Sequence, residues 1–264
     1  MKDLLFVLLA NTDHLAFNHL NSAMLESGKS KRIDATPDAI KSVAMRPDLI
    51  SLRVSLANFT ANHFQQVGSL LHLEGHIIGS DRASKKSPFG HGSDEVVAVS
   101  MLLRIGAQLI SASTDLFMDG RSYAAATLIR QMVEIEYLAW AFASRNHDAE
   151  RWLRSDQKER EEFFKPAKLR AAAQGKFRGK DYSYHCNLGG HPTPMAAMLL
   201  ADDPTIAQLL LSDVLGHAGQ IWNHIVAWAK SNNEDIIRTH SLEISAKFKE
   251  WTSRDLLVDL PPPP

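Results

Sequence analysis

Residues 93–118 read "SDEVVAVSMLLRIGAQLISASTDLFM", and this stretch decides the fold class. Its apolar residues recur at helical spacing and do not alternate with polar ones as in a strand. Ser93 or Asp94 can cap the N-terminus of this helix, and the acidic residues of its first turn complement the helix dipole. The stretch therefore predicts one long, apolar helix that ends at Asp119-Gly120.

A second apolar helix is predicted directly afterwards, from "RSYAAATLIRQMVEIEYLAWAFASR" at residues 121–145. So short a connection makes the two helices antiparallel neighbours. Ala124, Ala125 and Ala126 are small enough to let the two backbones approach closely.

Helical periodicity continues on both sides of this central pair, and strand signals are nearly absent from the chain. We expect an all-α bundle of roughly seven to nine helices. Residues 1–80 would form N-terminal helices and residues 94–254 the bundle core, with a proline-rich tail at 255–264, in one globular unit. Further expected features are a helix at 3–27, a helix start at Thr36-Pro37-Asp38, a break at Arg46-Pro47, a helix at 47–78, a loop at 79–94, a charged helix at 147–173 bent near Pro166, a loop at 182–194, a helix starting at Asp203-Pro204 and a last helix at 233–259.

Composition excludes several function classes. The net charge of -1 over 264 residues gives the whole chain no general attraction for nucleic acid. The single cysteine, Cys186, excludes an internal disulfide and a cysteine-based zinc site. We find no phosphate-binding glycine loop and no nucleophile elbow, so we expect no cofactor. No apolar run reaches the length of a membrane span, so we expect a cytoplasmic protein without membrane contact.

Arg130 and Glu134 are the first candidate site residues. They lie four positions apart, on one face of the apolar helix at 121–145, and can pair there. A charged pair in so apolar a helix is either a structural ion pair or part of a binding site. The candidate ligand-binding residues are Arg130, Glu134, Tyr137, Trp140 and Tyr184, with His191 nearby.

The segment 165–185 combines cations with aromatic residues. It carries six cations from Lys165 to Lys180 before its first acid, Asp181. The aromatic residues Phe177, Tyr182 and Tyr184 lie toward its C-terminal end. Such a pattern can hold phosphates and stack bases, which makes RNA a candidate partner. The alternative is a solvated helix end, where cations suit the helix dipole.

Histidine spacing offers a weak metal hypothesis. Three pairs are suggestive: His72 with His76, His185 with His191, and His217 with His224. A chain with 12 histidines produces such spacings by chance, so we expect no metal site.

Three runs, "MDGRSYAAATLIRQMVEIEYLAW", "ERWLRSDQKER" and "YSYHCNLGGHP", resemble an uncharacterised family of helical bacterial proteins over about residues 94–230. More distantly, the chain is similar to the HEPN superfamily of helical ribonucleases and nucleotide-binding proteins. The ribonucleases of that superfamily carry Arg, four to six residues, then His, which Arg178 and His185 match. The resemblance implies His185 as general acid and base and Arg178 as the group that stabilises phosphate charge. His191, in the loop that follows, is a further catalytic candidate.

Two main function classes remain open at this point, beside a metal-dependent hydrolase that would use the histidine pairs. One is a HEPN-like ribonuclease or other nucleic-acid-acting protein of a stress or defence system. The other is a non-enzymatic helical module that binds a small anionic or polar ligand through Arg130, or that assembles, for example as a homodimer. The sequence does not decide whether the protein is an enzyme.

Overall fold

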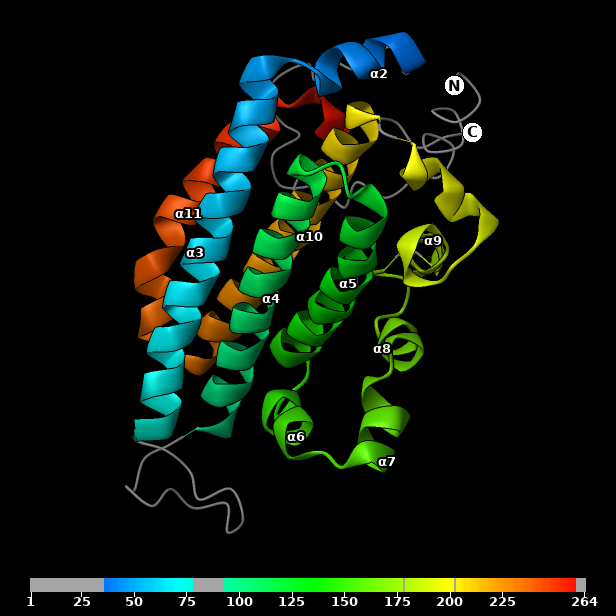
Figure 1. Ribbon diagram of the computed structural model, residues 1–264. Helices are drawn as coiled ribbons and strands as arrows, with labels where there is room; N and C mark the ends of the chain where they lie inside the picture. Colours follow the sequence, from blue (N-terminus) through cyan, green and yellow to red (C-terminus); the bar gives the residue numbers. More distant parts are fainter. Residues whose placement is uncertain (1–35, 78–92, 178, 202, 260–264) are drawn as a thin grey trace.

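The protein is an all-α bundle, as the sequence predicts (Figure 1). The computed structural model describes residues 36–77, 93–177, 179–201 and 203–259, and every secondary-structure element within these ranges is a helix. The expected helix at 3–27, most of the loop at 79–94 and the second half of the proline-rich tail, 260–264, lie outside the described residues.

Five long helices form the bundle. They are α3 (Pro47–Ile77), α4 (Asp94–Met118), α5 (Ser122–Ser144), α10 (Pro204–Asn232) and α11 (Asp235–Arg254). Short elements complete it: α2 (Pro37–Ala44), α6 (Asp148–Arg154), α7 (Gln157–Glu159), the π-helix η3 (Arg160–Phe164), α8 (Pro166–Ala172), α9 (Gly179–His185), the π-helix η4 (Cys186–Gly190), and the 3₁₀-helices η5 (Pro194–Leu200) and η6 (Leu256–Asp259).

Local signals set the central antiparallel pair of α4 and α5. The Ser93 side chain accepts a hydrogen bond from the Val96 amide and caps α4. Asp119 ends the helix, and Gly120 follows with φ +73°, a left-handed conformation that glycine adopts without strain. The chain then reverses into α5, and the two helices pack side by side (Figure 1).

Helix α10 is the centre of the bundle. Every residue from Thr205 to Trp222 is buried. The helix packs against α3, α4, α5 and α11, so it has no solvent face along this length. Polar side chains on this stretch therefore need partners inside the protein, because an unpaired buried polar group is costly.

Helix α4 is the one described helix that is long and apolar enough to cross a membrane. Two thirds of its most apolar window, 67%, is buried among the other helices of the bundle. That burial is typical of the core helix of a helical bundle.

The charged region at 147–173 is broken more often than expected. Ser155 is extended (ψ 138°) and ends α6, and the Asp156 side chain then caps α7 by accepting from the Glu159 amide. Pro166 opens α8 rather than bending a continuous helix. These breaks raise the number of helices slightly above the expected range.

The expected loop at 182–194 is wrong over most of its length. The structure forms α9 and η4 through Gly190, and non-helical backbone follows at residues 191–193. Gly189 explains the difference, because a Cβ there would lie 2.6 Å from the carbonyl carbon of Ala126. The glycine pair thus lets η4 pack directly on the backbone of α5, where Thr127 Oγ1 donates to the Gly189 carbonyl over 2.9 Å.

Candidate functional site

A half-buried polar cluster lies where α9 crosses α5. Arg130 Nε lies 3.4 Å from Glu134 Oε1, and the Tyr182 hydroxyl donates to the same oxygen over 2.8 Å. The side chains of Arg130 and Glu134 remain 29% and 33% exposed. The pair therefore has access to solvent, as a ligand site requires.

Two guanidinium groups lie near the Tyr182 ring. The Cζ atom of Arg130, from α5, lies 6.0 Å from the ring centroid, and that of Arg170, from α8, lies 5.5 Å from it. The side chains of residues 165–176 include four cations and no acid. The cluster thus places two arginines near the ring of Tyr182, whose hydroxyl donates to Glu134, beside an exposed basic helix.

Two further predicted ligand-binding residues, Tyr137 and Trp140, lie near this cluster, but they are packed rather than open. Tyr137 is fully buried and Trp140 is nearly so. The Phe177 ring lies 4.3 Å from that of Tyr137 and 5.5 Å from that of Trp140, between ring centroids. The chain therefore fills the space behind Arg130 with its own aromatic residues, which leaves the charged rim as the part open to a ligand.

Burial and Glu134 both act on Tyr182. Burial raises the pKa of its phenol most strongly, and the hydrogen bond to Glu134 and the charge of that carboxylate raise the pKa further. The phenol therefore stays protonated at neutral pH and acts as a hydrogen-bond donor to Glu134.

Gly190 brings the chain close to Arg130. A Cβ on Gly190 would lie 2.8 Å from Arg130 Cδ and 3.5 Å from its Nη1. His191 follows directly after Gly190, at the end of η4, and is exposed, with extended backbone (φ -138°, ψ 150°). The sequence-predicted His191 thus adjoins the rim of the cluster.

The other catalytic candidates lie elsewhere. Arg178 lies outside the described residues. His185 is completely buried, and Tyr184, 6% exposed, packs its ring 5.1 Å from the His185 ring. Tyr182 and His185 lie on one short helix, yet the first contacts Glu134 and the second faces α10.

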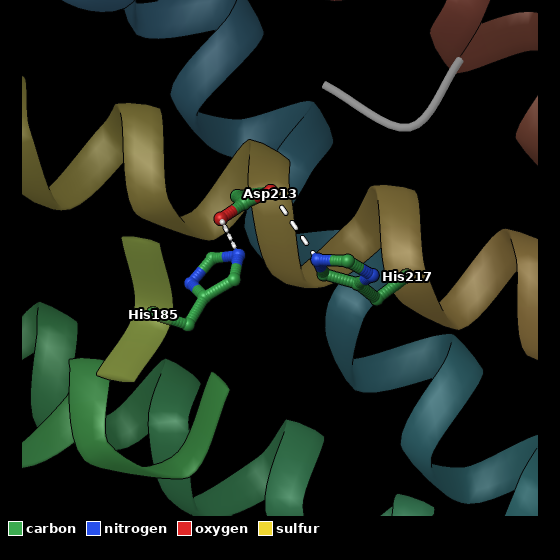
Figure 2. A group of neighbouring side chains, drawn as sticks. All are labelled: His185, Asp213 and His217. Carbon is green, nitrogen blue, oxygen red and sulfur yellow. Dashed lines mark ion pairs between the residues drawn. The ribbon is translucent and has the colours of Figure 1, made fainter. Parts of the chain in front are cut away.

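His185 belongs to a second, buried group (Figure 2). Its Nε2 lies 3.5 Å from Asp213 Oδ2, and His217 Nε2 lies 3.6 Å from Asp213 Oδ1. Figure 2 shows both histidines turned toward Asp213, His185 from α9 and the other two residues from α10. The Nδ1 atom of His217 lies 2.7 Å from Oε2 of Glu136, a residue of α5.

The histidine pairs proposed from spacing are not the ones that this group uses. His217 groups with His185 and Asp213, while His224, seven residues on, does not belong to it. The side chain of His76 lies outside the described residues. Sequence reasoning missed Asp213 and Glu136. Asp213 had a signal, since it lies four positions before His217 on an apolar helix.

The basic segment presents cations outward and aromatic rings inward. Lys165, Lys168 and Lys176 are exposed. Phe177 and Tyr182 instead contact Tyr137. An RNA strand on this surface would therefore meet charged side chains, and base stacking on the two rings would require them to leave their packing partners.

A separate pocket of about 320 Å³ lies at the corner between α4 and α5, beside the start of α10. Its lining includes Phe117, Met118, Asp119 and Asp203. None of the sequence-predicted site residues line it.

No protein-family model, curated protein or solved structure matches this chain.

Proposed function

We propose that the protein is a non-enzymatic helical binding module that takes a small phosphate-bearing ligand at the cluster of Arg130, Glu134, Arg170 and Tyr182. The observation that carries the proposal is the placement of two guanidinium groups near the Tyr182 ring, with solvent access at Arg130. Guanidinium groups bind phosphate through paired, charge-assisted hydrogen bonds, and paired arginines are typical of phosphate recognition.

The ion pair of Arg130 supports this reading. Glu134 approaches its Nε at 3.4 Å, longer than a charge-assisted hydrogen bond, and shares the same oxygen with Tyr182. Arg130 and Arg170 place two positive charges beside the Tyr182 ring, which favours an anionic ligand.

The burial of His185 favours binding over RNA hydrolysis through that residue. A general acid or base must come within hydrogen-bond reach of the atom it serves. The His185 side chain has no exposed surface and faces Asp213 on α10. The exposed cluster on the other side of α9 is the part that an external ligand can reach.

A thermal-shift panel tests the proposal on the purified full chain. The probes are inorganic phosphate, adenosine monophosphate and uncharged adenosine. We expect the two phosphates to raise the melting temperature and adenosine to leave it unchanged. Arg130→Gln and Arg170→Gln should each remove the shift. Arg121→Gln is the matched control, because Arg121 is an exposed arginine paired with Asp119 away from the cluster. Shifts of equal size in all variants, or none with either phosphate, would refute the proposal.

Nucleic-acid binding is the second candidate, favoured by the three exposed lysines beside Arg170. A gel-shift assay with a single-stranded RNA would use the variant Lys168→Gln/Lys176→Gln, with Lys249→Gln on α11 as the control. Phosphate contacts predict a weaker affinity in the double variant and a loss of affinity with rising salt. Unchanged affinity in the double variant would exclude this surface, and cleavage of the RNA would support the ribonuclease hypothesis instead.

A further inference from the structure

We infer that His185, Asp213 and His217 form a binding site for one divalent first-row transition metal ion, with Glu136 as the residue that positions His217. The three ligand atoms all lie within 4.8 Å of one another. The site is separate from the phosphate cluster, because α9 presents Tyr182 to one and His185 to the other.

The distances fit an ion better than direct hydrogen bonds. The separations of 3.5 and 3.6 Å between Asp213 and the two histidines exceed the 2.7–3.2 Å typical of an N–H···O hydrogen bond. Ligand atoms bound to a tetrahedral ion at about 2.1 Å lie about 3.4 Å apart. The two observed separations, which end on different oxygens of Asp213, are close to that spacing.

The ligand types select the class of metal. Two imidazoles and one carboxylate suit zinc and the neighbouring divalent transition ions, whereas calcium and magnesium prefer oxygen atoms throughout. Both histidines present Nε2 toward Asp213, so both can bind through the same ring atom. Zinc is accordingly the first ion to test.

Glu136 supplies the outer contact that metal-bound histidines commonly have. Its carboxylate lies 2.7 Å from Nδ1 of His217, which places the Nδ1 proton on that side and leaves Nε2 as the metal-binding nitrogen. The arrangement links α5, α9 and α10 around one point.

The balance of charge in the buried group also favours a bound cation. Asp213 and Glu136 have side chains only 7% and 8% exposed; Asp213 lies against both fully buried histidines and Glu136 against His217. Buried carboxylates are stable when they are paired with positive charge or bind a metal. A divalent cation carries the charge that offsets both carboxylates.

Burial indicates a structural rather than a catalytic ion. Neither histidine side chain has exposed surface, so a substrate has no route to the ion in this conformation. The ion would attach α9 to α10, and a bound metal contributes its binding free energy to folding. We therefore expect metal removal to loosen the segment 179–190 before the rest of the bundle.

Metal analysis of the purified full chain tests the inference. The chain is stripped with a chelator, reconstituted with Zn²⁺ and dialysed, and zinc is measured by mass spectrometry. We expect one equivalent of zinc in the wild type and its loss in Asp213→Asn and His217→Gln. Glu136→Gln should retain zinc with an affinity about 10–100-fold lower, as for other outer contacts of metal ligands.

Two controls separate this site from other sources of zinc. His224→Gln removes another buried histidine of the same helix, outside the group. Glu95→Gln alters a second group of possible ligands, Glu95, His147 and Glu150, which lies at the surface. Both variants should bind zinc as the wild type does.

X-ray absorption on the zinc-loaded wild type keeps the test decisive if the buried variants fail to fold. We expect two imidazoles and no sulfur, with nitrogen or oxygen ligands at about 2.0–2.1 Å. A wild-type chain that retains none of Zn²⁺, Co²⁺, Mn²⁺ or Fe²⁺ would overturn the inference. A spectrum with fewer than two imidazoles, or folded group variants that keep wild-type affinity, would overturn it too.

Discussion

Arg53 on α3 and Asp255 beyond the end of α11 form a buried, two-pronged ion pair across 202 positions of sequence. Arg53 Nε and Nη2 donate to the two carboxylate oxygens over 2.6 and 2.8 Å, and both side chains are 0% exposed. Arg53 Nη1 also donates to the Ala44 carbonyl, at the end of α2, over 2.9 Å. One side chain thus joins three helices of the bundle.

Asp255→Asn should therefore lower the free energy of unfolding by about 3–5 kcal/mol, because it leaves a buried guanidinium without its counter-charge. Urea denaturation measures the change. Arg254→Gln is the matched control, since Arg254 pairs with Glu250 at the surface, where such pairs contribute less than about 1 kcal/mol. Equal losses of unfolding free energy in the two variants would show that the buried pair stabilises the protein no more than a surface pair does.

Gly189→Ala should destabilise the protein by about 1–3 kcal/mol, because the new methyl group would overlap the backbone of α5. The clash distances are 2.6 Å to Ala126 C and 2.7 Å to Thr127 N, and backbone atoms cannot move aside as a side chain can. Gly106→Ala is the control, since its Cβ would approach the Phe64 ring at 3.3 Å. A smaller loss in Gly189→Ala than in Gly106→Ala would contradict the packing described.

His224 should give the protein a defined acid sensitivity. Burial lowers the pKa of its imidazole to about 3, and the positive charge of Lys176 adds to the effect. The unfolded chain, with a histidine pKa near 6.5, takes up a proton between about pH 6.5 and 3 that the folded chain does not. The contribution of His224 to the free energy of unfolding is therefore complete above this pH window. It falls as the pH drops through the window, by about 1.4 kcal/mol per pH unit.

Urea denaturation at pH 7, 6 and 5 measures this contribution. His224→Gln should lose less stability on acidification than the wild type. His147→Gln, which removes an exposed histidine, is the control for the loss of one imidazole. Parallel pH profiles for wild type and His224→Gln would show that His224 titrates normally.

Tyr182 should ionise at higher pH than an ordinary tyrosine. Its phenolate absorbance should appear above the ordinary tyrosine pKa of about 10, and Tyr182→Phe should remove that late component. Glu134→Gln should move the component to lower pH, because it removes a negative charge and a strong hydrogen-bond acceptor. An unchanged titration in Glu134→Gln would contradict the hydrogen bond.

Short-range chemistry explains why much of the fold could be predicted. The Ser93 cap and the Asp119-Gly120 end of α4 depend on residues a few positions apart, and both were confirmed. The break before Pro47 is likewise a local effect of proline. Such features are readable in a single sequence.

The parts that the sequence missed depend on contacts between distant segments. Gly189-Gly190 predicts a loop by local propensity, yet packing on Ala126 makes the segment helical. The meeting of His185 with Asp213 depends on how α9 lies against α10, which spacing does not reveal. The pairing of Arg130 with Glu134 could be predicted from the sequence, because both residues lie on one face of the same helix.

The most direct test of the proposed function is a calorimetric titration of adenosine monophosphate into the wild type, Arg130→Gln and Arg121→Gln in parallel. Loss of a charge-assisted contact predicts a Kd at least about tenfold weaker in Arg130→Gln. The account predicts saturable one-to-one binding in the wild type and in Arg121→Gln, with that weakening in Arg130→Gln alone. Equal Kd values in the three proteins, or no saturable binding in the wild type, would contradict it.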